Sequence, residues 1–181
     1  MKNTLIDVKI NNIYLKELKE DDAKALYVIA SNKEVMRTLN WGPIKSLAEA
    51  KIIINDFYLS RKKEGLPAGY GIWYLDVMIG VIDFHTYNKE LNEIEIGYFL
   101  DYKFWGNGIM TKCLKKALWV AFTYLECDKV KVGASRMNKA SLRVIEKCGF
   151  KYEYESICHL NYGDDIALYY SYYRYEYEGG D

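Results

Sequence analysis

The apolar residues of this chain recur at two spacings, one typical of strands and the other of helices. Alternation predicts a first strand over 10–17, in which Ile13 and Leu15 face the core. Six later segments have strand character, and these are 70–75, 78–84, 93–100, 129–134, 152–158 and 166–177. Helical spacing predicts four helices, which are 21–30, 46–63, 108–125 and 138–148.

Local signals support several of these boundaries. Ser46 and Glu49 form the Ser-x-x-Glu pattern of a capping box at the start of the second helix. Gly149 follows the last helix, where a left-handed residue commonly ends the helical hydrogen bonding. The predicted order is β-α-α-β-β-β-α-β-α-β-β, in which antiparallel strands surround a strand–helix–strand–helix core. This order predicts a mixed α/β (α+β) fold and disfavours a doubly wound sheet, which needs a regular alternation.

Composition indicates an ordinary globular protein. The chain has 181 residues, of which 50% are apolar and 28% are charged, so we expect a single domain over 1–181. The sequence lacks a run of about 18 apolar residues, so no membrane-spanning helix and no membrane partner are expected. Asp7 and Lys9 interrupt the N-terminal segment, which therefore differs from a signal peptide. We expect a cytoplasmic protein.

The cysteines and histidines give no sign of a metal site. The four cysteines lack CxxC spacing, and the two histidines, His85 and His159, have no ligand-like spacing to them. In a chain expected to be cytoplasmic, the cysteines are predicted to be reduced, mostly buried thiols. We therefore expect no metal ion.

Formal charges cancel over the whole chain but separate along it. Zero net charge argues against generic nucleic-acid binding. Residues 111–151 carry ten basic and three acidic side chains, whereas 64–110 and 152–181 are acidic. A basic block between acidic ones is compatible with an anionic ligand and a cationic substrate that meet in one domain. Solvated charges on separate surfaces would give the same pattern.

A glycine-rich turn follows the strand over 93–100. Its sequence is Trp105-Gly106-Asn107-Gly108-Ile109-Met110, and it leads directly into the next helix. A strand, a glycine turn and a helix N-terminus together make an anion site, because free backbone amides converge there and the helix dipole adds positive potential. The turn lacks the Gly-Lys-Ser/Thr of a Walker loop and the third glycine of a dinucleotide fingerprint. A helix start that merely needs small residues would also fit.

A second motif begins the helix over 138–148. Asn138 suits the N-cap position, Ser141 lies in the first turn, and Gly149 and Phe150 follow the helix. These residue types have a purely structural explanation as helix caps. The motif becomes informative beside the glycine turn, because the two lie about 30 residues apart and are joined by a helix and a strand.

Together the two motifs resemble those of the GCN5-related N-acetyltransferase (GNAT) family, and the resemblance extends from about Ile13 to Tyr175. The family's pyrophosphate loop, Gln/Arg-x-x-Gly-x-Gly/Ala, corresponds to the glycine turn, although Trp105 and Met110 depart from that pattern. Four features are similar to those of one branch, the Rim-type ribosomal-protein N-terminal acetyltransferases. They are the Trp-Gly-x-Gly form, the preceding Glu-Ile-Gly-Tyr, an early Trp-x-Pro, and Asn-x-x-Ser before Gly-Phe. The resemblance implies a GNAT fold, in which a central, mostly antiparallel twisted sheet is splayed at the cofactor site and flanked by helices.

The resemblance also implies a binding site for acetyl-CoA as a co-substrate. Backbone groups around Phe99 and Leu100 would bind the pantetheine amides and the acetyl carbonyl, and Asn138 would bind the pantetheine arm. The loop that holds the pyrophosphate would consist of Trp105, Gly106, Asn107, Gly108, Ile109, Met110 and Thr111. Candidates for binding the remaining phosphate are Lys112, Lys139 and Arg143.

Two catalytic residues are expected. Many family members protonate the departing thiolate with a Tyr where this chain has Ile145, and in the Rim-like branch the residue at Ser141 is thought to take this role. An amine must be neutral to attack, and Glu95 is the first candidate for the base, acting through water, because it lies on the strand that enters the acetyl site. A strand charge paired with a neighbour is the alternative for Glu95. Asp83 and His85 are weaker candidates for the base.

The expected function is an acetyl-CoA-dependent N-acetyltransferase that moves an acetyl group directly to a primary amine, with a protein N-terminal α-amine as one acceptor. One alternative is the acetylation of a small amine, such as a polyamine, an antibiotic or an amino acid. The other is a non-catalytic acyl-CoA-binding protein of the same fold. The sequence is compatible with a monomer and with a homodimer.

Overall fold

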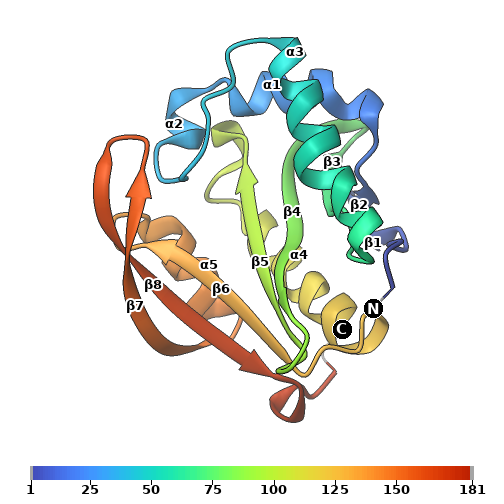
Figure 1. Ribbon diagram of the computed structural model, residues 1–181, viewed down its shortest axis with the longest axis vertical. Coiled ribbons are helices and arrows are strands. Elements are labelled where there is room, and N and C mark those ends of the chain that lie inside the picture. The colour runs from blue at the N-terminus through green and yellow to red at the C-terminus, as the bar shows by residue number, and fades with distance from the viewer. Residues whose placement is uncertain (1, 180–181) are drawn as a thin grey trace.

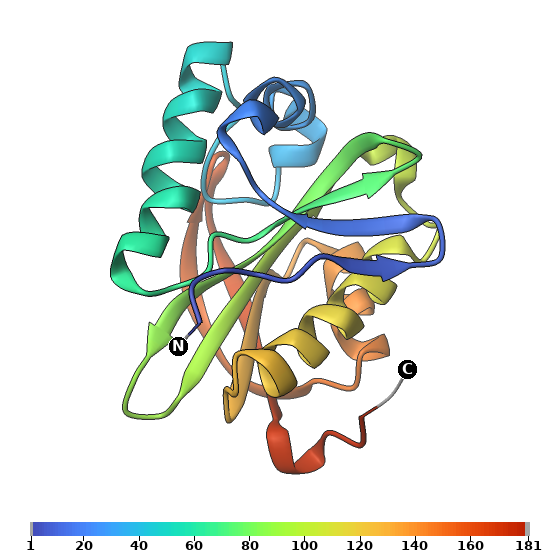
Figure 2. The same ribbon diagram turned by 90° about the vertical axis from the view of Figure 1, so that its right-hand side faces the viewer.

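The computed structural model describes residues 2–179, which form an eight-stranded sheet between two layers of helices (Figure 1, Figure 2). The strands follow the order β1-β2-β3-β4-β5-β6-β8-β7, and all neighbours are antiparallel except the parallel pair β5 and β6. The prediction of a mixed α/β fold with a mostly antiparallel sheet is confirmed. The strands are β1 Val8–Ile10, β2 Ile13–Glu17, β3 Tyr70–Tyr74, β4 Val77–Asn88, β5 Glu93–Leu100, β6 Lys129–Ser135, β7 Lys151–Leu160 and β8 Gly163–Tyr173.

The helices fall into two groups, one before β3 and one after β5. They are α1 Ala23–Ala30, α2 Lys33–Met36, α3 Leu47–Ile52, α4 Ile109–Trp119 and α5 Lys139–Lys147. The helix of α3 continues through a π-helical turn and a 3₁₀ segment to Glu64, and that of α4 continues through a π-helical turn to Tyr124. Shorter 3₁₀ turns span Glu20–Asp22, Tyr102–Phe104 and Arg174–Glu176. Within residues 2–179, no helix has both the length and the apolar character needed to cross a membrane.

Two differences from the sequence predictions lie in the first third of the chain. The strand predicted over 10–17 is a hairpin of β1 and β2, because Asn11 takes a left-handed φ of 53° and reverses the chain. The short helix α2 was not predicted, since four residues carry too little periodicity to be recognised. Its N-cap, Asn32, does accept a hydrogen bond from the Glu34 amide at 2.9 Å.

The last strand also differs from its prediction over 166–177. It begins earlier, at Gly163, and ends at Tyr173. There the chain leaves the sheet because Arg174 binds the turn before β6. Its backbone amide donates to the Asp128 carbonyl at 2.9 Å, and its Nε donates to the Cys127 carbonyl at 2.8 Å.

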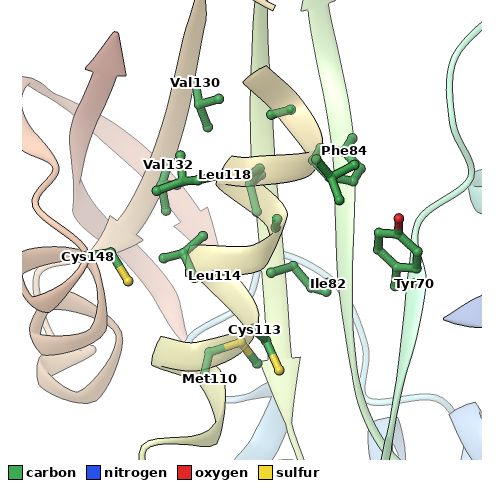
Figure 3. Close-up of a cluster of buried hydrophobic side chains, with 14 of the residues drawn as sticks. Tyr70, Ile82, Phe84, Met110, Cys113, Leu114, Leu118, Val130, Val132 and Cys148 are labelled. Atoms are coloured by element: carbon green, nitrogen blue, oxygen red, sulfur yellow. The ribbon is translucent and has the colours of Figure 1, made fainter. Parts of the chain in front are cut away.

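Alternate residues of the sheet face two separate hydrophobic cores. The first core lies under α4 and α5, and Figure 3 shows Leu114 and Leu118 of α4 packed over the strands within it. The second core lies under α1 and α3 and contains Val81 and Phe99. Because side chains alternate along a strand, Tyr98 points to the α4 and α5 side, whereas Phe99 points to the α1 side.

The parallel pair β5 and β6 is joined along only part of its length. Glu93–Glu95 pair with Lys129–Lys131, and beyond that point β5 follows β4 to Leu100 while β6 follows β8. The two strands therefore diverge toward their carboxyl ends, as Figure 1 shows. On the side that faces β6, residues 96–100 have no strand partner within the described part of the chain.

Candidate active site

A cavity of about 610 Å³ lies where β5 and β6 diverge, and its size is within the usual range for small-molecule sites. Segments far apart in the sequence line it, namely α2 with the turn after it, the end of β5, the glycine turn, and the starts of α4 and α5. The fold brings ten of the predicted site residues together here, and these are Phe99, Leu100, Trp105, Gly106, Gly108, Ile109, Met110, Thr111, Asn138 and Ser141.

The glycine turn offers open space and free amides to this cavity. Gly106 and Gly108 have φ values of 78° and 70°, and a Cβ atom at either residue would meet no atom within 4 Å. Gly108 is the N-cap of α4, so the first amides of that helix, from Ile109 to Thr111, lack acceptors within the helix. The positive end of the helix dipole adds to their attraction for an anion.

Trp105 and Asn107 shape the turn from within. The Trp105 indole Nε1 donates to the Leu100 carbonyl at 2.7 Å, which ties the turn to the end of β5. Asn107 lies outside the cavity lining, because its side-chain amide points back and donates to the carbonyls of Trp105 at 3.1 Å and Phe104 at 3.3 Å. Its side chain therefore stabilises the turn, and binding of the cofactor by Asn107 stays a prediction.

Asn138 joins the start of α5 to the turn after α2. Its Oδ1 accepts the Ser141 amide at 3.0 Å, as the N-cap prediction requires, and its Nδ2 donates to Thr38 Oγ1 at 2.7 Å. A hydrogen bond from Asn138 to a pantetheine arm stays a prediction, for which the Nδ2 group has a second hydrogen beside the one donated to Thr38. The lining residues from the α2 region, such as Val35 and Leu39, carry no sequence motif that could have marked them.

Ser141 meets a second hydroxyl group in the cavity wall. The Tyr98 hydroxyl lies 2.8 Å from Ser141 Oγ and 3.3 Å from the Ser141 carbonyl oxygen. Burial raises the pKa of the Tyr98 phenol well above its ordinary value of 10, against a smaller lowering by the hydrogen bond with Ser141. Sequence reasoning missed Tyr98 as a site residue, although Glu-Ile-Gly-Tyr contains it. Ile145, where other family members have a Tyr, is fully buried in the core.

Basic residues of α5 stand along one side of the cavity. Lys139, Arg143 and Lys147 all line it, and their spacing of four residues places them on one face of the helix. Lys112, also a candidate for binding phosphate, lies outside the lining. Lys147 was not predicted, although the four-residue spacing could have indicated it.

Glu95 lies on the opposite face of the sheet from Tyr98 and Ser141, because odd-numbered residues of β5 point to the α1 side. It stands outside the cavity lining, between two basic side chains. Its carboxylate is 3.7 Å from His85 Nε2 and 3.9 Å from Lys131 Nζ. These pairs agree with the alternative interpretation of Glu95, a strand charge paired with a neighbour. The role of Glu95 as a base stays a prediction.

His85 and Asp83 continue this charged group on β4. The Arg61 guanidinium lies 2.5 Å from Asp83, and with His85 it outweighs the effect of burial and lowers the pKa of that carboxyl. His85 Nδ1 is 3.6 Å from Asp83, an ion-pair distance. Burial opposes charge on His85, but Asp83 and Glu95 together raise the pKa of the imidazole from 6.5 to about 9. His85 is therefore protonated at neutral pH.

Gly97 leaves room for the side chains of Asp83 and His85, because a Cβ at Gly97 would lie 2.8 Å from Asp83 Oδ1.

Residues 12–151 match the family model described as an acetyltransferase (GNAT) domain. The curated protein YdaF of Bacillus subtilis (strain 168), a putative ribosomal N-acetyltransferase, is 32% identical over 172 residues, which cover 92% of this chain and 93% of that protein. A solved structure of a probable acetyltransferase has a TM-score of 0.84 and 25% identity, with 95% of this chain and 99% of the other covered. RimL, a ribosomal L7/L12 alpha-N-protein acetyltransferase solved with coenzyme A, has a TM-score of 0.82 and 20% identity, with 93% and 98% covered.

The chain belongs to the GNAT family, as the resemblance of its motifs predicted. It is an N-acetyltransferase that uses acetyl-CoA as a co-substrate. Among residues 2–179, no group of three or more His, Cys, Asp or Glu side chains is placed to hold a metal ion.

The Gly108→Val substitution tests whether the glycine turn binds acetyl-CoA. A branched side chain there would fill the space above the α4 amides, so we expect the Kd for acetyl-CoA, measured by calorimetry, to rise by roughly tenfold or more, or about 1.4 kcal/mol. Gly65→Val is a matched control, since Gly65 has a φ of 77°, equally open surroundings and a place outside the cavity lining. An unchanged Kd in Gly108→Val, or an equal rise in both variants, would contradict the assignment.

The protonation of His85 predicts a pH dependence of stability. Because its pKa is raised in the folded chain, its stabilising contribution is fully present below about pH 6.5 and is lost as the pH rises through about 9. The free energy of unfolding of the wild type relative to His85→Gln should therefore be larger at about pH 6 than at about pH 10. His159→Gln, which changes an exposed imidazole, is the control. A difference that is the same at both pH values would show that folding leaves the pKa of His85 unchanged, and would contradict the raised pKa.

Proposed function

We propose that this enzyme transfers the acetyl group of acetyl-CoA directly to a primary amine, and that the acceptor is the α-amine of a protein N-terminus. One observation carries the proposal: β5 and β6 pair over only a short stretch, so the sheet opens between two faces that carry different side chains. Tyr98 and Ser141 line the cavity from the α4 and α5 side, and Glu95 lies on the other face of the sheet. A thioester and an amine could thus meet at the gap from opposite faces.

The cavity provides a place for each part of acetyl-CoA. The pyrophosphate would lie on the amides at the start of α4, and the basic row of α5, Lys139, Arg143 and Lys147, would attract the remaining phosphate. The pantetheine arm would follow the unpaired edge of β5 near Phe99 and Leu100, where backbone groups can bind its amides. In this arrangement the thioester would lie close to Ser141.

The chemistry of the acceptor favours an α-amine. The pKa of an α-amine is about 7.7–8.0, so roughly one molecule in ten is neutral at pH 7 and can attack. A lysine side chain, with a pKa of about 10.4, would need far more help from a base. Glu95, already held by His85 and Lys131, would act as that base through a water molecule. Weak assistance of this kind is sufficient for an α-amine.

In the proposed reaction, the amine nitrogen forms a bond to the acetyl carbon and the carbon–sulfur bond breaks. The electron pair of that bond stays on sulfur as a thiolate, which faces Ser141. The proton lost by the nitrogen passes to water on the Glu95 side. The names of YdaF and RimL, which refer to ribosomal proteins, support a protein acceptor for this chain as well.

An acceptor panel tests this function. Coenzyme A release from acetyl-CoA would be measured with peptides that have free N-termini, with the same peptides N-acetylated but containing lysine, and with polyamines and amino acids. We expect release only with free N-termini, and a mass increase on the α-amine. Release of coenzyme A with polyamines or amino acids alone would show that the acceptor is a small amine and not a protein N-terminus. Binding of acetyl-CoA without release for any amine would support the non-catalytic alternative.

A further inference from the structure

Two hydroxyl groups from different elements share one hydrogen bond in the wall of the cavity. Tyr98 comes from β5 and Ser141 from the first turn of α5, and their oxygens are 2.8 Å apart. Both residues have a fixed backbone, because Tyr98 pairs with Ile82 of β4 and the Ser141 amide donates to the Asn138 cap. The bond therefore joins the two sides of the opening between β5 and α5.

This bond can have either of two directions. In one arrangement Tyr98 donates to Ser141 Oγ, and the serine hydrogen is free to point into the cavity. In the other, Ser141 donates to Tyr98, and Tyr98 donates to the Ser141 carbonyl. Both arrangements use the 2.8 Å contact, and the second adds the longer one at 3.3 Å, so a bound thiolate, which can only accept a hydrogen bond, selects the first. Only the first leaves Ser141 with a hydrogen for a ligand.

We propose that Tyr98 is a positioning residue, which turns the Ser141 hydroxyl hydrogen toward the thiolate that leaves when acetyl-CoA is cleaved. The inference rests on the proposed function for the nature of the leaving group and extends it to a residue outside the predicted site. Among residues 2–179, Tyr98 is the one side chain that forms a hydrogen bond with Ser141 Oγ and so fixes the direction of its hydrogen. Ile145, fully buried and apolar, offers no hydroxyl group in its place.

The acidities of these groups define what the pair does. Burial raises the pKa of Tyr98 above 10, whereas a thiol has a pKa of about 8.5, so a proton would not move from the phenol to the thiolate at equilibrium. A serine hydroxyl is a weaker acid still. The pair therefore stabilises the thiolate by donating a hydrogen bond, and both hydroxyl groups keep their protons. The thiolate then takes its proton from water as coenzyme A is released.

The pKa of the bound coenzyme A thiol tests this inference without any acceptor. The thiolate is followed by its ultraviolet absorbance during a pH titration of the complex, with desulfo-coenzyme A as the reference. A hydrogen bond to a charged group should lower the thiol pKa, so Tyr98→Phe and Ser141→Ala should each raise it by roughly one relative to the wild type. The double variant should show no larger shift than Ser141→Ala alone, because Tyr98 acts through Ser141.

Tyr87→Phe is the matched control. The Tyr87 hydroxyl bonds to Asn92 Oδ1 at 2.9 Å at the far end of the β4–β5 hairpin, so this variant also loses one phenol hydrogen bond but should leave the thiol pKa unchanged. Equal thiol pKa values in the wild type and Tyr98→Phe would overturn the inference. A further rise on adding Tyr98→Phe to Ser141→Ala would do the same, since it would show that Tyr98 acts independently.

Turnover separates this inference from the proposed function. With an active acceptor, kcat of Tyr98→Phe should fall by roughly tenfold while the KM for acetyl-CoA stays within about twofold, because a hydrogen bond that forms only with the departing thiolate affects the chemical step. If the thiol pKa shifts as expected but no amine is acetylated, the proposed function is wrong and the positioning by Tyr98 stands. A matching loss of kcat in the Ser141→Ala background would overturn the positioning role.

Discussion

The short parallel pairing of β5 and β6 is the constraint on which the active site depends. Three residue pairs join the strands at Glu93–Glu95, and each strand is then held by its other neighbour, β4 or β8. Longer pairing would close the sheet and satisfy the free backbone of β5. Within 2–179, residues 96–100 have no strand partner on this edge, and although the Leu100 carbonyl accepts from Trp105, such an edge favours an extended ligand with amide groups.

The two halves of the opened sheet are held at a fixed distance by polar contacts across the gap. Asn138 of the α5 cap donates to Thr38, and Asn161 in the β7–β8 turn donates to the carbonyls of Met36 at 3.2 Å and Trp41 at 3.0 Å. The end of α2 and the segment after it thus contact both the start of α5 and the β7–β8 turn. These contacts fix the width of the cavity, whereas the two hydrophobic cores fix the sheet itself.

Sequence patterns predicted the elements with strong local signals. The strand over 93–100 matches β5 in both bounds, and the caps Ser46 and Asn138 accept the hydrogen bonds expected of them. Predictions failed where the signal was short or depended on tertiary contacts, as in the β1–β2 hairpin and in α2. The glycine turn was found because its conformation needs glycine. Tyr98 was not assigned to the site, since its role depends on Ser141, 43 residues away in the chain.

Backbone amide exchange along β5 tests the central claim, that the unpaired edge of this strand receives acetyl-CoA. The rates would be measured for the wild-type protein with and without the cofactor. Acetyl-CoA should slow exchange within 96–100 and at the start of α4, and leave Glu93–Glu95 unchanged, because the β6 pairing already occupies that part of the strand. Unchanged exchange within 96–100 in a saturated complex would contradict the account.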